Sequence, residues 1–434
     1  MLLIYTHRTT PRLQYIFDLI FNEIICTEYE IITDLEKFIQ YSGPKISYTF
    51  EPVYNEPFFC ATSLLFENDI RDQHINVFSS NGYPCFYSTN YKSVLSFDPF
   101  AASFYLVTRY EEYLPQKRDQ YDRFLASESV AFNNNFLKMP IVNNWCMLIR
   151  KKISEKYPAL NWKEKKYKFI PTIDVDYCFS YLDKGFMRTA GSYARAAIGL
   201  DFADIKQRTK VLFHLKKDPY NTFDELKELH KKYDLDPVYF FLLGDYDVND
   251  KNISVQSKNF RKIIKSTADY VKVGIHPSFA SNYQSTKLKI EISRLSDILK
   301  VDINKSRQHF LKITFPNTYR HLIDADIEED YSLGYATDVG FRAGICVPYF
   351  YYDLDSEIKT NLRIFPFCLM DATLKYYLKL NANEAMDYIK PIIQEVKKVN
   401  GTFISIWHND AYSDYKLWNG WKKVYDDLLI VAAT

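Results

Sequence analysis

The sequence predicts an α/β protein built around a parallel sheet. From about residue 168 onward, short apolar runs alternate with segments of helical spacing, and that order is typical of parallel strands joined by crossover helices. Several of the apolar runs end directly in a carboxylate or an imidazole, beginning with residues 169–176. Because the carboxyl ends of parallel strands open into the ligand crevice of such folds, these residues predict a site at that edge of the sheet.

Composition narrows the class of protein further. The 434 residues are 47% hydrophobic and 25% charged, which is typical of a globular protein long enough for two domains. The formal net charge is +1, so no overall field favours nucleic acid or an anionic membrane as a partner. The seven cysteines are odd in number and form no C-x-x-C pair, which favours a reducing compartment. The chain starts without the pattern of a secretory signal and holds no run long enough to span a bilayer, so we expect a cytoplasmic protein.

The first 150 residues predict a smaller α/β domain. We expect a strand at residues 2–5, an amphipathic helix over 10–23 and a helix that begins at the pair Asp98-Pro99. Between about 150 and 166, the pair Tyr157-Pro158 and a charged stretch interrupt the helical pattern. We therefore place one domain, of unknown role, at residues 1–150 and a second at 166–434.

The second domain carries the alternating elements. We expect strands at 169–173, 238–243, 271–275 and 402–407, and helices at 222–232 and 257–265. Near the end of the chain, Asn383 can cap a helix through Val396, and Gly401 suits the position just past its end. Pro391 should kink that helix or mark a restart.

Two carboxylates and a histidine form the first part of the candidate site. Asp174 and Asp176 are two residues apart, so on an extended chain they point the same way. One of them can bind a cation while the other serves as a base. His276 follows a strand directly and is a candidate metal ligand. Zinc is compatible with Asp and His ligands and an open position for water.

The second part lies further along the chain. Arg307 and His309 alternate with Gln308, so we expect both on one strand face. Arg307 can clamp a carboxylate or form a buried salt bridge, and the sequence leaves both open. His408 ends the last strand, where a general acid would be placed, and Asp410 can orient it.

These motifs, in this order, resemble those of the polysaccharide deacetylases of the NodB-homology class, carbohydrate esterase family four, over about residues 166–434. Thr172-Ile173-Asp174-Val175-Asp176 looks like the Thr-Phe-Asp-Asp motif of that family with one residue inserted. The resemblance implies that Asp174 is the base and Asp176 the metal ligand, although the insertion allows the reverse. Gly274-Ile275-His276 matches the first histidine ligand, but Ala280 occupies the position of the second. Ser278, Ser281, His309 or water would then complete the ligand set.

Two further motifs also resemble motifs of that family. Arg307-Gln308-His309-Phe310 looks like an Arg-x-Pro-Tyr motif, and Ile406-Trp407-His408 looks like a Leu-x-His motif. The resemblance implies catalytic roles for Asp174, Arg307 and His408. The side chains expected to contact substrate are Tyr331 in an Asp-Tyr-Ser stretch, Arg342, Trp407 and Asp410. The whole chain also looks like a two-domain group of deacetylases from Bacteroidetes-type bacteria.

The resemblance implies a distorted (β/α)7-type barrel preceded by a smaller α/β domain. It also implies a zinc-dependent hydrolase that removes N- or O-acetyl groups from a carbohydrate, without nucleic acid as a partner. Two alternatives remain open. Ala280 favours a catalytically impaired carbohydrate-binding relative, and because fold does not fix function, an amidohydrolase acting on a small non-sugar amide is the other. The sequence makes no prediction of oligomeric state.

Overall fold

The computed structural model describes residues 1–434 and contains two main sheets. The smaller sheet has the strand order β2-β1-β3-β4, and all its neighbours are parallel. Its strands are β1 (Leu2–Tyr5), β2 (Tyr29–Ile32), β3 (Lys45–Thr49) and β4 (Phe58–Cys60). A separate antiparallel pair joins β5 (Phe78–Ser80) to β6 (Tyr83–Cys85). The strand expected at residues 2–5 is confirmed.

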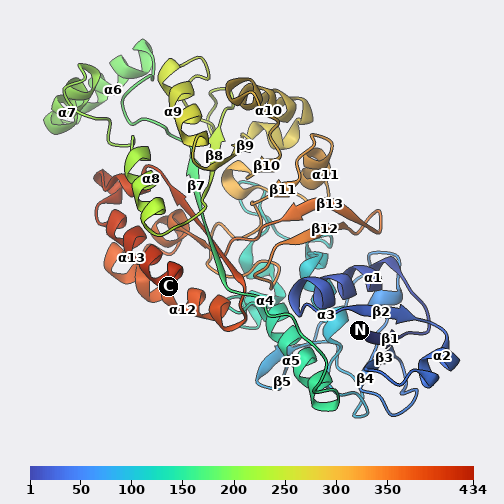
Figure 1. Ribbon diagram of the computed structural model, residues 1–434. Helices are drawn as coiled ribbons and strands as arrows, with labels where there is room; N and C mark the ends of the chain where they lie inside the picture. The colour runs from blue at the N-terminus through green and yellow to red at the C-terminus, as the bar shows by residue number, and fades with distance from the viewer.

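Helices pack around the smaller sheet, at the lower right of Figure 1. They are α1 (Pro11–Phe17), which continues as a π-helix over Asp18–Ile24, α2 (Leu35–Gln40), α3 (Pro99–Val107), α4 (Val130–Asn133) and α5 (Ile141–Lys156). The carboxylate of Asp98 accepts hydrogen bonds from the backbone N–H groups of Phe100 and Ala101, both at 3.0 Å, and Pro99 takes the first helical position. This is the helix start expected from the Asp-Pro pair.

The larger sheet has nine strands in the order β12-β13-β11-β10-β9-β8-β7-β15-β14. The strands are β7 (Lys168–Val175), β8 (Val238–Leu242), β9 (Lys272–His276), β10 (Lys305–Ser306), β11 (Glu329–Asp330), β12 (Tyr349–Asp353), β13 (Ile358–Ile364), β14 (Leu369–Met370) and β15 (Thr402–His408). Only β12 runs antiparallel to its neighbour. The register pairs His408 with Asp174 and Leu242 with His276, so the polar ends of these strands meet at one edge.

Helices lie between these strands in the chain. They are α6 (Phe186–Ile198), α7 (Phe202–Leu212), α8 (Phe223–Lys232), α9 (Lys258–Ala268), α10 (Ser285–Leu299), α11 (Asn317–Ile323) and α12 (Ala382–Lys398), and α13 (Trp421–Ala433) follows the last strand. Asn381, rather than Asn383 as predicted, caps α12, and Glu384 completes a capping box. Pro391 lies inside α12 without ending it. No helix combines the length and the apolar character that crossing a membrane requires.

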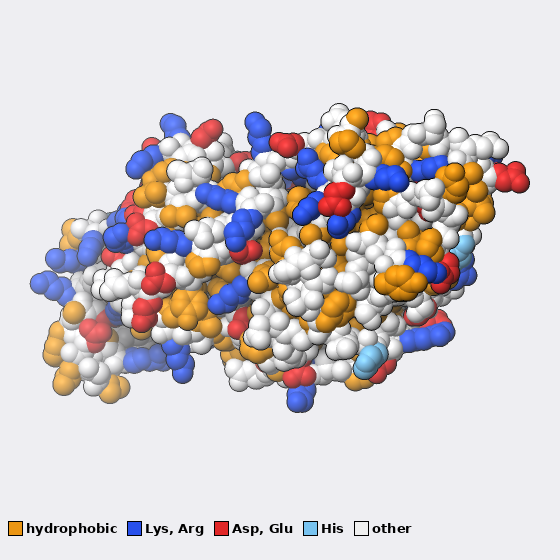
Figure 2. All heavy atoms as spheres, turned by 90° about the horizontal axis from the view of Figure 1, so that it is seen from below, with side chains coloured by type: hydrophobic (Ala, Val, Ile, Leu, Met, Phe, Trp, Pro, Cys, Tyr) orange, Lys and Arg blue, Asp and Glu red, His pale blue; other side chains and the backbone are white.

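The α/β class and the parallel sheet are confirmed. The strands β12 and β14 are the two ends of the large sheet and do not pair with each other, so closure into a (β/α)7-type barrel is not confirmed. Figure 2 shows acidic and basic side chains interspersed over much of the face in view, in keeping with the near-zero net charge.

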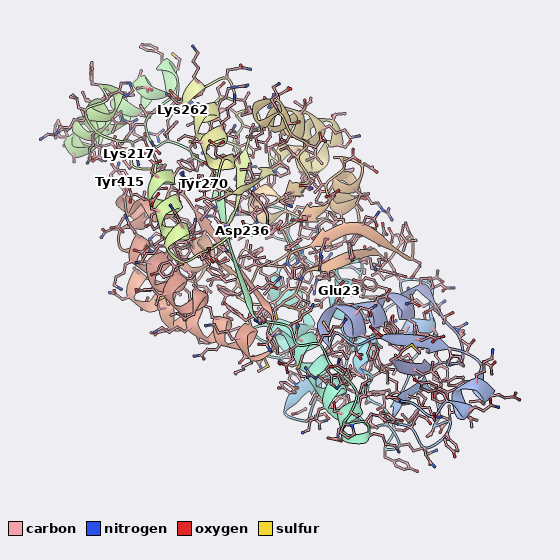
Figure 3. The ribbon with its side chains drawn as sticks, viewed as in Figure 1. Glu23, Lys217, Asp236, Lys262, Tyr270 and Tyr415 are labelled. Carbon is pink, nitrogen blue, oxygen red and sulfur yellow. The ribbon has the colours of Figure 1, made fainter.

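Buried polar contacts join the two parts of the chain. Glu112 accepts hydrogen bonds from Arg109 Nε at 2.7 Å and from Arg342 Nε at 2.8 Å, and all three side chains are almost fully buried. Arg109 also donates to the backbone carbonyl of Arg342. One hydrophobic core of 98 buried residues extends from Leu2 to Ala432. Figure 3 labels Glu23, which reaches Arg363 of β13 at 3.5 Å. The division at 150–166 stays a prediction, but the two parts share a continuous interior.

Candidate metal centre and active site

A cavity of about 320 Å³ opens at the carboxyl edge of the large sheet. Its polar lining consists of Arg123, Asp174, Asp176, His276, Gln308, His309 and His408. Apolar and aromatic side chains complete the wall, among them Phe310, Leu311, Met370, Tyr376 and Tyr377. The structure therefore brings together five of the predicted site residues, Asp174, Asp176, His276, His309 and His408. It adds Gln308 and Phe310, which the sequence analysis named only as parts of a motif.

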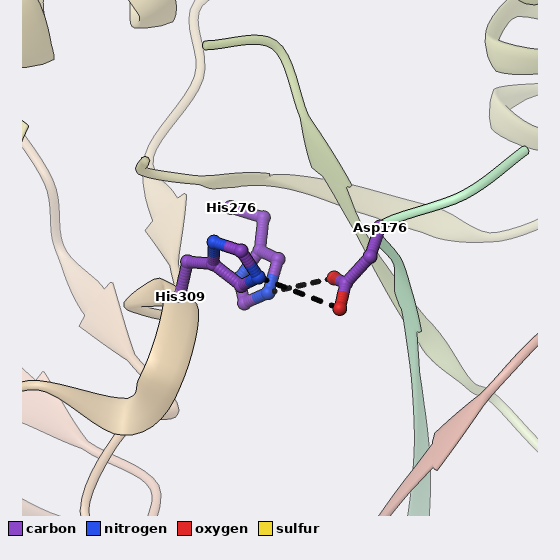
Figure 4. Close-up of side chains that lie close together, drawn as sticks. All are labelled: Asp176, His276 and His309. Atoms are coloured by element: carbon purple, nitrogen blue, oxygen red, sulfur yellow. Dashed lines mark ion pairs between the residues drawn. The ribbon is translucent and has the colours of Figure 1, made fainter. Parts of the chain in front are cut away.

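Three imidazoles converge on the carboxylate of Asp176. His276 Nε2 lies 3.2 Å from Oδ1, His309 Nε2 lies 3.5 Å from Oδ2, and His408 Nε2 lies 3.8 Å from Oδ2. Figure 4 shows the first two of these contacts. The pKa of Asp176 is held well below its usual range, because the neighbouring histidines outweigh the effect of burial.

A hydrogen bond on the far side of each ring orients each imidazole. The Nδ1 of His276 donates to the backbone carbonyl of Arg307, and the Nδ1 atoms of His309 and His408 donate to Asp250 and Asp371, both at 2.8 Å. Carbonyl and carboxylate oxygens accept hydrogen bonds but do not donate them, so each Nδ1 carries a proton. All three rings therefore present Nε2 to the cavity. This outer arrangement is the one that typically fixes histidine ligands of a metal.

The donor atoms fit a divalent metal ion. One ligand atom each from Asp176, His276 and His309 lies within 4.8 Å of the other two. Asp176 Oδ1 is shielded from solvent and has no hydrogen-bond partner, which is costly for a carboxylate oxygen unless a cation satisfies it. Two imidazoles and a carboxylate, with space beside them, are the donor set of a catalytic zinc site. His309 supplies the second imidazole of this cluster.

The segment around Ala280 still supports the centre through its backbone. The N–H groups of Phe279 and Ala280 donate to Asp250 at 2.9 and 3.3 Å, and Asp250 in turn holds His309. Burial lowers the pKa of His309, but the carboxylates of Asp176 and Asp250 outweigh it and raise the pKa to about 9.

Asp174 is clamped by Arg307 beside this centre. Arg307 Nη1 donates to Asp174 Oδ1 at 3.0 Å and to Thr172 Oγ1 at 2.6 Å, and its Nε donates to the carbonyl of Tyr331 at 3.0 Å. Both charged side chains are nearly or fully buried. The clamp and the buried salt bridge, which the sequence left as alternatives, are thus the same contact. Arg307 and His309 do not share a strand face, since β10 ends at Ser306 and a tight turn follows.

His408 is paired with Asp371, not with Asp410 as predicted. The Asp371 carboxylate accepts from both the ring Nδ1 and the backbone N–H of His408. Burial lowers the pKa of His408, but Asp371 and then Asp176 raise it well above its ordinary value. Asp410 instead accepts from Trp418 Nε1 at 3.1 Å.

None of the four residues expected to contact substrate, Tyr331, Arg342, Trp407 and Asp410, lines the cavity. Trp407 is fully buried and packs against Tyr425, with the ring centroids 5.0 Å apart. Tyr331 stacks on Phe365 at 4.4 Å, and Arg342 belongs to the buried network with Glu112. The structure does not bring these side chains to the site.

The Asp-Tyr-Ser stretch acts on the site through the backbone. Asp330 accepts hydrogen bonds from the N–H and the hydroxyl of Ser332, and the same hydroxyl accepts from the N–H of Gln308 at 2.8 Å. Burial raises the pKa of Asp330 to about 6. The stretch therefore positions residues 307–309 without lining the cavity itself.

Sequence reasoning missed three polar residues of this region. Asp371 follows β14 directly, so it carried the same strand-end signal as Asp174, but a two-residue strand shows no pattern. Asp250 lies in a loop without any signal. Arg123 precedes the large sheet by more than 40 residues and had been given no role.

Arg123 supports the turn that carries His309. It donates to the carbonyl of Phe310 at 3.1 Å and to the hydroxyl of Tyr377 at 3.0 Å, while Asp119 accepts from its Nε at 2.7 Å. Phe310 and Leu311 both have left-handed backbone angles, with φ of 60° and 55°. Such a conformation is strained for non-glycine residues and persists where its surroundings hold it.

Comparison with known proteins gives one family match, to the N-terminal part of the chain, and several solved structures of similar fold. Residues 2–158 match a family of unknown function, DUF7033, and no curated protein matches the chain. The chain is similar to solved structures of low sequence identity. A candidate polysaccharide deacetylase from Mycobacterium smegmatis has 12% identity and a TM-score of 0.39, with 63% of this chain and 86% of that chain covered. A polysaccharide deacetylase from Bacillus cereus has 11% identity and a TM-score of 0.31, with 61% and 88% covered.

A CE4 family pseudoenzyme from Bacillus anthracis has 10% identity and a TM-score of 0.30, with 61% of this chain and 60% of that chain covered. The solved structures that resemble this chain thus include both polysaccharide deacetylases and a relative described as a pseudoenzyme. At these identities and scores, the likeness does not define the family of this chain.

Proposed function

We propose that this protein is a metal-dependent hydrolase that removes N- or O-acetyl groups from a carbohydrate. The observation that supports it best is the convergence of Asp176, His276 and His309 beside a second, separately clamped carboxylate, Asp174. A metal centre next to an independent base is one arrangement that catalyses hydrolysis of an acyl bond.

Asp176, His276 and His309 would hold the ion, and zinc suits this donor set. When bound, the ion supplies Lewis acidity that lowers the pKa of water and polarises a carbonyl oxygen.

Asp174 is placed to accept the proton of the attacking water. Arg307 orients its carboxylate through the hydrogen bond from Nη1 to Oδ1. His408 is placed to protonate the leaving amine or alcohol. Burial lowers its pKa, but Asp371 outweighs burial and raises the pKa, which favours the protonated ring that an acid needs; Asp371 also keeps the ring turned toward the cavity.

Metal content and activity of matched variants test the proposal. Asp174→Asn should abolish acetate release from acetylated chitooligosaccharides and acetylated xylan while the bound zinc, measured by mass spectrometry, is retained. Asp176→Asn and His276→Ala should lose both the zinc and the activity. His74→Ala, at an exposed histidine far from these residues in sequence, is the control and should change neither. Equal activity in all four proteins would refute the assignment.

The carbohydrate-binding alternative rests on Ala280, where a histidine ligand was expected. It predicts glycan binding, measured by calorimetry, with no acetate release from any acetylated substrate at any zinc concentration. The amidohydrolase alternative predicts turnover of small non-sugar acetamides in preference to acetylated glycans. Acetate release from glycans and from small acetamides, together with glycan binding, therefore distinguishes the three functions.

A further inference from the structure

The helices α6 and α7 form a hairpin that projects from the body of the protein, at the upper left of Figure 1. Helix α6 is amphipathic, but its apolar side faces outward. Phe186, Met187 and Ile198 are 84%, 81% and 85% exposed, and the exposed small residues between them, at positions 190, 191, 194 and 197, continue the same helical face. A helix of a globular protein normally buries this face.

The opposite side of α6 is polar and faces the protein. The hydroxyl of Tyr193 lies 2.9 Å from Thr209 Oγ1 of α7, and the guanidinium of Arg188 lies over the ring of Tyr246, 4.6 Å from its centroid. These contacts fix the rotation of the helix about its axis. The outward position of the apolar residues is therefore built into the fold.

The exposed apolar surface continues beyond α6. Leu200 and Phe202 at the turn between the helices are 71% and 68% exposed, and Phe213 and Leu215 after α7 are 70% and 77% exposed. Single exposed apolar side chains are ordinary on a protein surface, but seven large ones on one hairpin mark an interaction site.

The charges around this surface are mostly positive. Between residues 186 and 217, the exposed basic side chains are Arg195, Lys206, Lys210, Lys216 and Lys217. Asp201 is the exposed acid of this segment, because Asp204 is buried and paired with Arg208 at 2.8 Å. Figure 2 shows hydrophobic and basic side chains at the left end of the molecule, with acidic side chains among them.

The hairpin is anchored near the edge of the sheet that carries the cavity. It follows Asp176 in the chain, and the hydroxyl of Tyr181 at its base lies 2.6 Å from the hydroxyl of Tyr415 and donates to Asp204 at 2.7 Å. Tyr415 and Lys217 are labelled near this base in Figure 3. Whatever binds the hairpin therefore lies on the same side of the molecule as the cavity.

We propose that the outward face of the α6–α7 hairpin is a docking site for a bilayer surface with anionic headgroups. Apolar side chains flanked by lysines are the chemistry that inserts at the headgroup boundary and is held there by negative charge. The charges disfavour a second copy of the chain as the occupant, because a symmetric contact through this face would bring the same lysines together. The proposal does not depend on the reaction proposed above.

Sedimentation with lipid vesicles tests the proposal with the full chain. The protein should bind vesicles of phosphatidylcholine with phosphatidylglycerol, and should bind vesicles of phosphatidylcholine alone more weakly. Phe186→Ser/Ile198→Ser/Phe202→Ser should lower the partition by roughly tenfold or more, since three large side chains no longer leave water. Lys206→Glu/Lys210→Glu should remove the preference for the anionic vesicles. The control Val301→Ser/Ile358→Ser changes exposed side chains elsewhere and should bind as the native chain does.

Circular dichroism melting checks that each variant stays folded, which we expect because every substituted side chain is exposed. No binding of the native chain to either kind of vesicle would overturn the proposal. Equal binding of the native chain and the triple variant would also overturn it. If sedimentation velocity showed a dimer that the triple variant abolishes, without vesicle binding, the face would be a contact between copies of the chain.

Discussion

Replacing His309 by alanine tests the metal centre most directly. His309 supplies one of three ligand atoms that lie within 4.8 Å of one another. Structural zinc sites with about four protein ligands bind with about 10–16 kcal/mol at neutral pH, or about 2.5–4 kcal/mol for each ligand. His309→Ala should therefore weaken zinc binding by roughly two to three orders of magnitude at pH 7. Competition with a chromophoric chelator measures the affinity, and His74→Ala should leave it unchanged.

The pH dependence of the zinc affinity gives a second, independent check on the role of His309. Without metal, the pKa of His309 is about 9 because Asp176 and Asp250 flank it. At pH 7 its ring is protonated, so zinc must displace that proton, and the affinity of the native protein should rise by about tenfold per pH unit up to about pH 9. His309→Ala has no such proton to lose, so its affinity should rise less steeply over the same range.

Two results would refute this reasoning. One is zinc binding by His309→Ala that is as tight as in the native protein. The other is the same slope of affinity against pH in both proteins, since that slope would then not arise from His309. Asp250→Asn separates ligation from orientation, because it keeps the imidazole but weakens its support, and losses of about 10–100-fold are usual for such partners.

Three further predictions follow from the contacts of the site. Asp371→Asn removes the charge that raises the pKa of His408, so kcat should fall by about 10²-fold or more. The alkaline limb of the pH–rate profile should also move to lower pH, and an unmoved limb would exclude His408 as the acid. Arg307→Met leaves Asp174 buried without its partner and should lower the free energy of unfolding by about 3–5 kcal/mol in urea titrations; an unchanged midpoint would show that the pair is not needed. Arg123→Ala releases the turn that carries one of the zinc ligands, so zinc affinity should fall by roughly tenfold, as for other outer supports of metal ligands, and chelator competition that finds native affinity would contradict that role.

The strand ends were the part of the site that the sequence could predict. Asp174, Asp176, His276 and His408 each follow an apolar run, and the parallel register then brings them to one edge of the sheet. That inference needs only the period of a strand and the direction of its neighbours.

The same strand geometry explains why Trp407 was misplaced. It was expected to contact substrate because it precedes His408, but adjacent residues of a strand face opposite sides. With His408 directed to the cavity, Trp407 must face away, where it packs against Tyr425. Its position could have been predicted from the alternation alone.

The remaining parts of the site depend on tertiary contacts that no local pattern records. Asp250 reaches His309 from a loop, and Arg123 reaches the turn at 309–311 from the part of the chain that precedes the large sheet. Neither residue lies at the end of a long strand. Their roles follow only from tertiary packing, which brings distant segments of the chain to His309 and its turn.

The buried network of Arg109, Glu112 and Arg342 bears on whether evolution can separate the two parts of the chain. If residues 2–158 were absent, Arg342 would lose the carboxylate that neutralises it, and the part of the shared hydrophobic core that these residues cover would be exposed to water. Exposing apolar surface costs about 25 cal/mol per Å², so the loss would be a large share of the stability of a typical domain. Recombination that transferred the large sheet without residues 2–158 should therefore give an unstable protein. Substitutions at Arg342 and at Arg109 or Glu112 should accordingly be correlated across relatives that keep both parts of the chain.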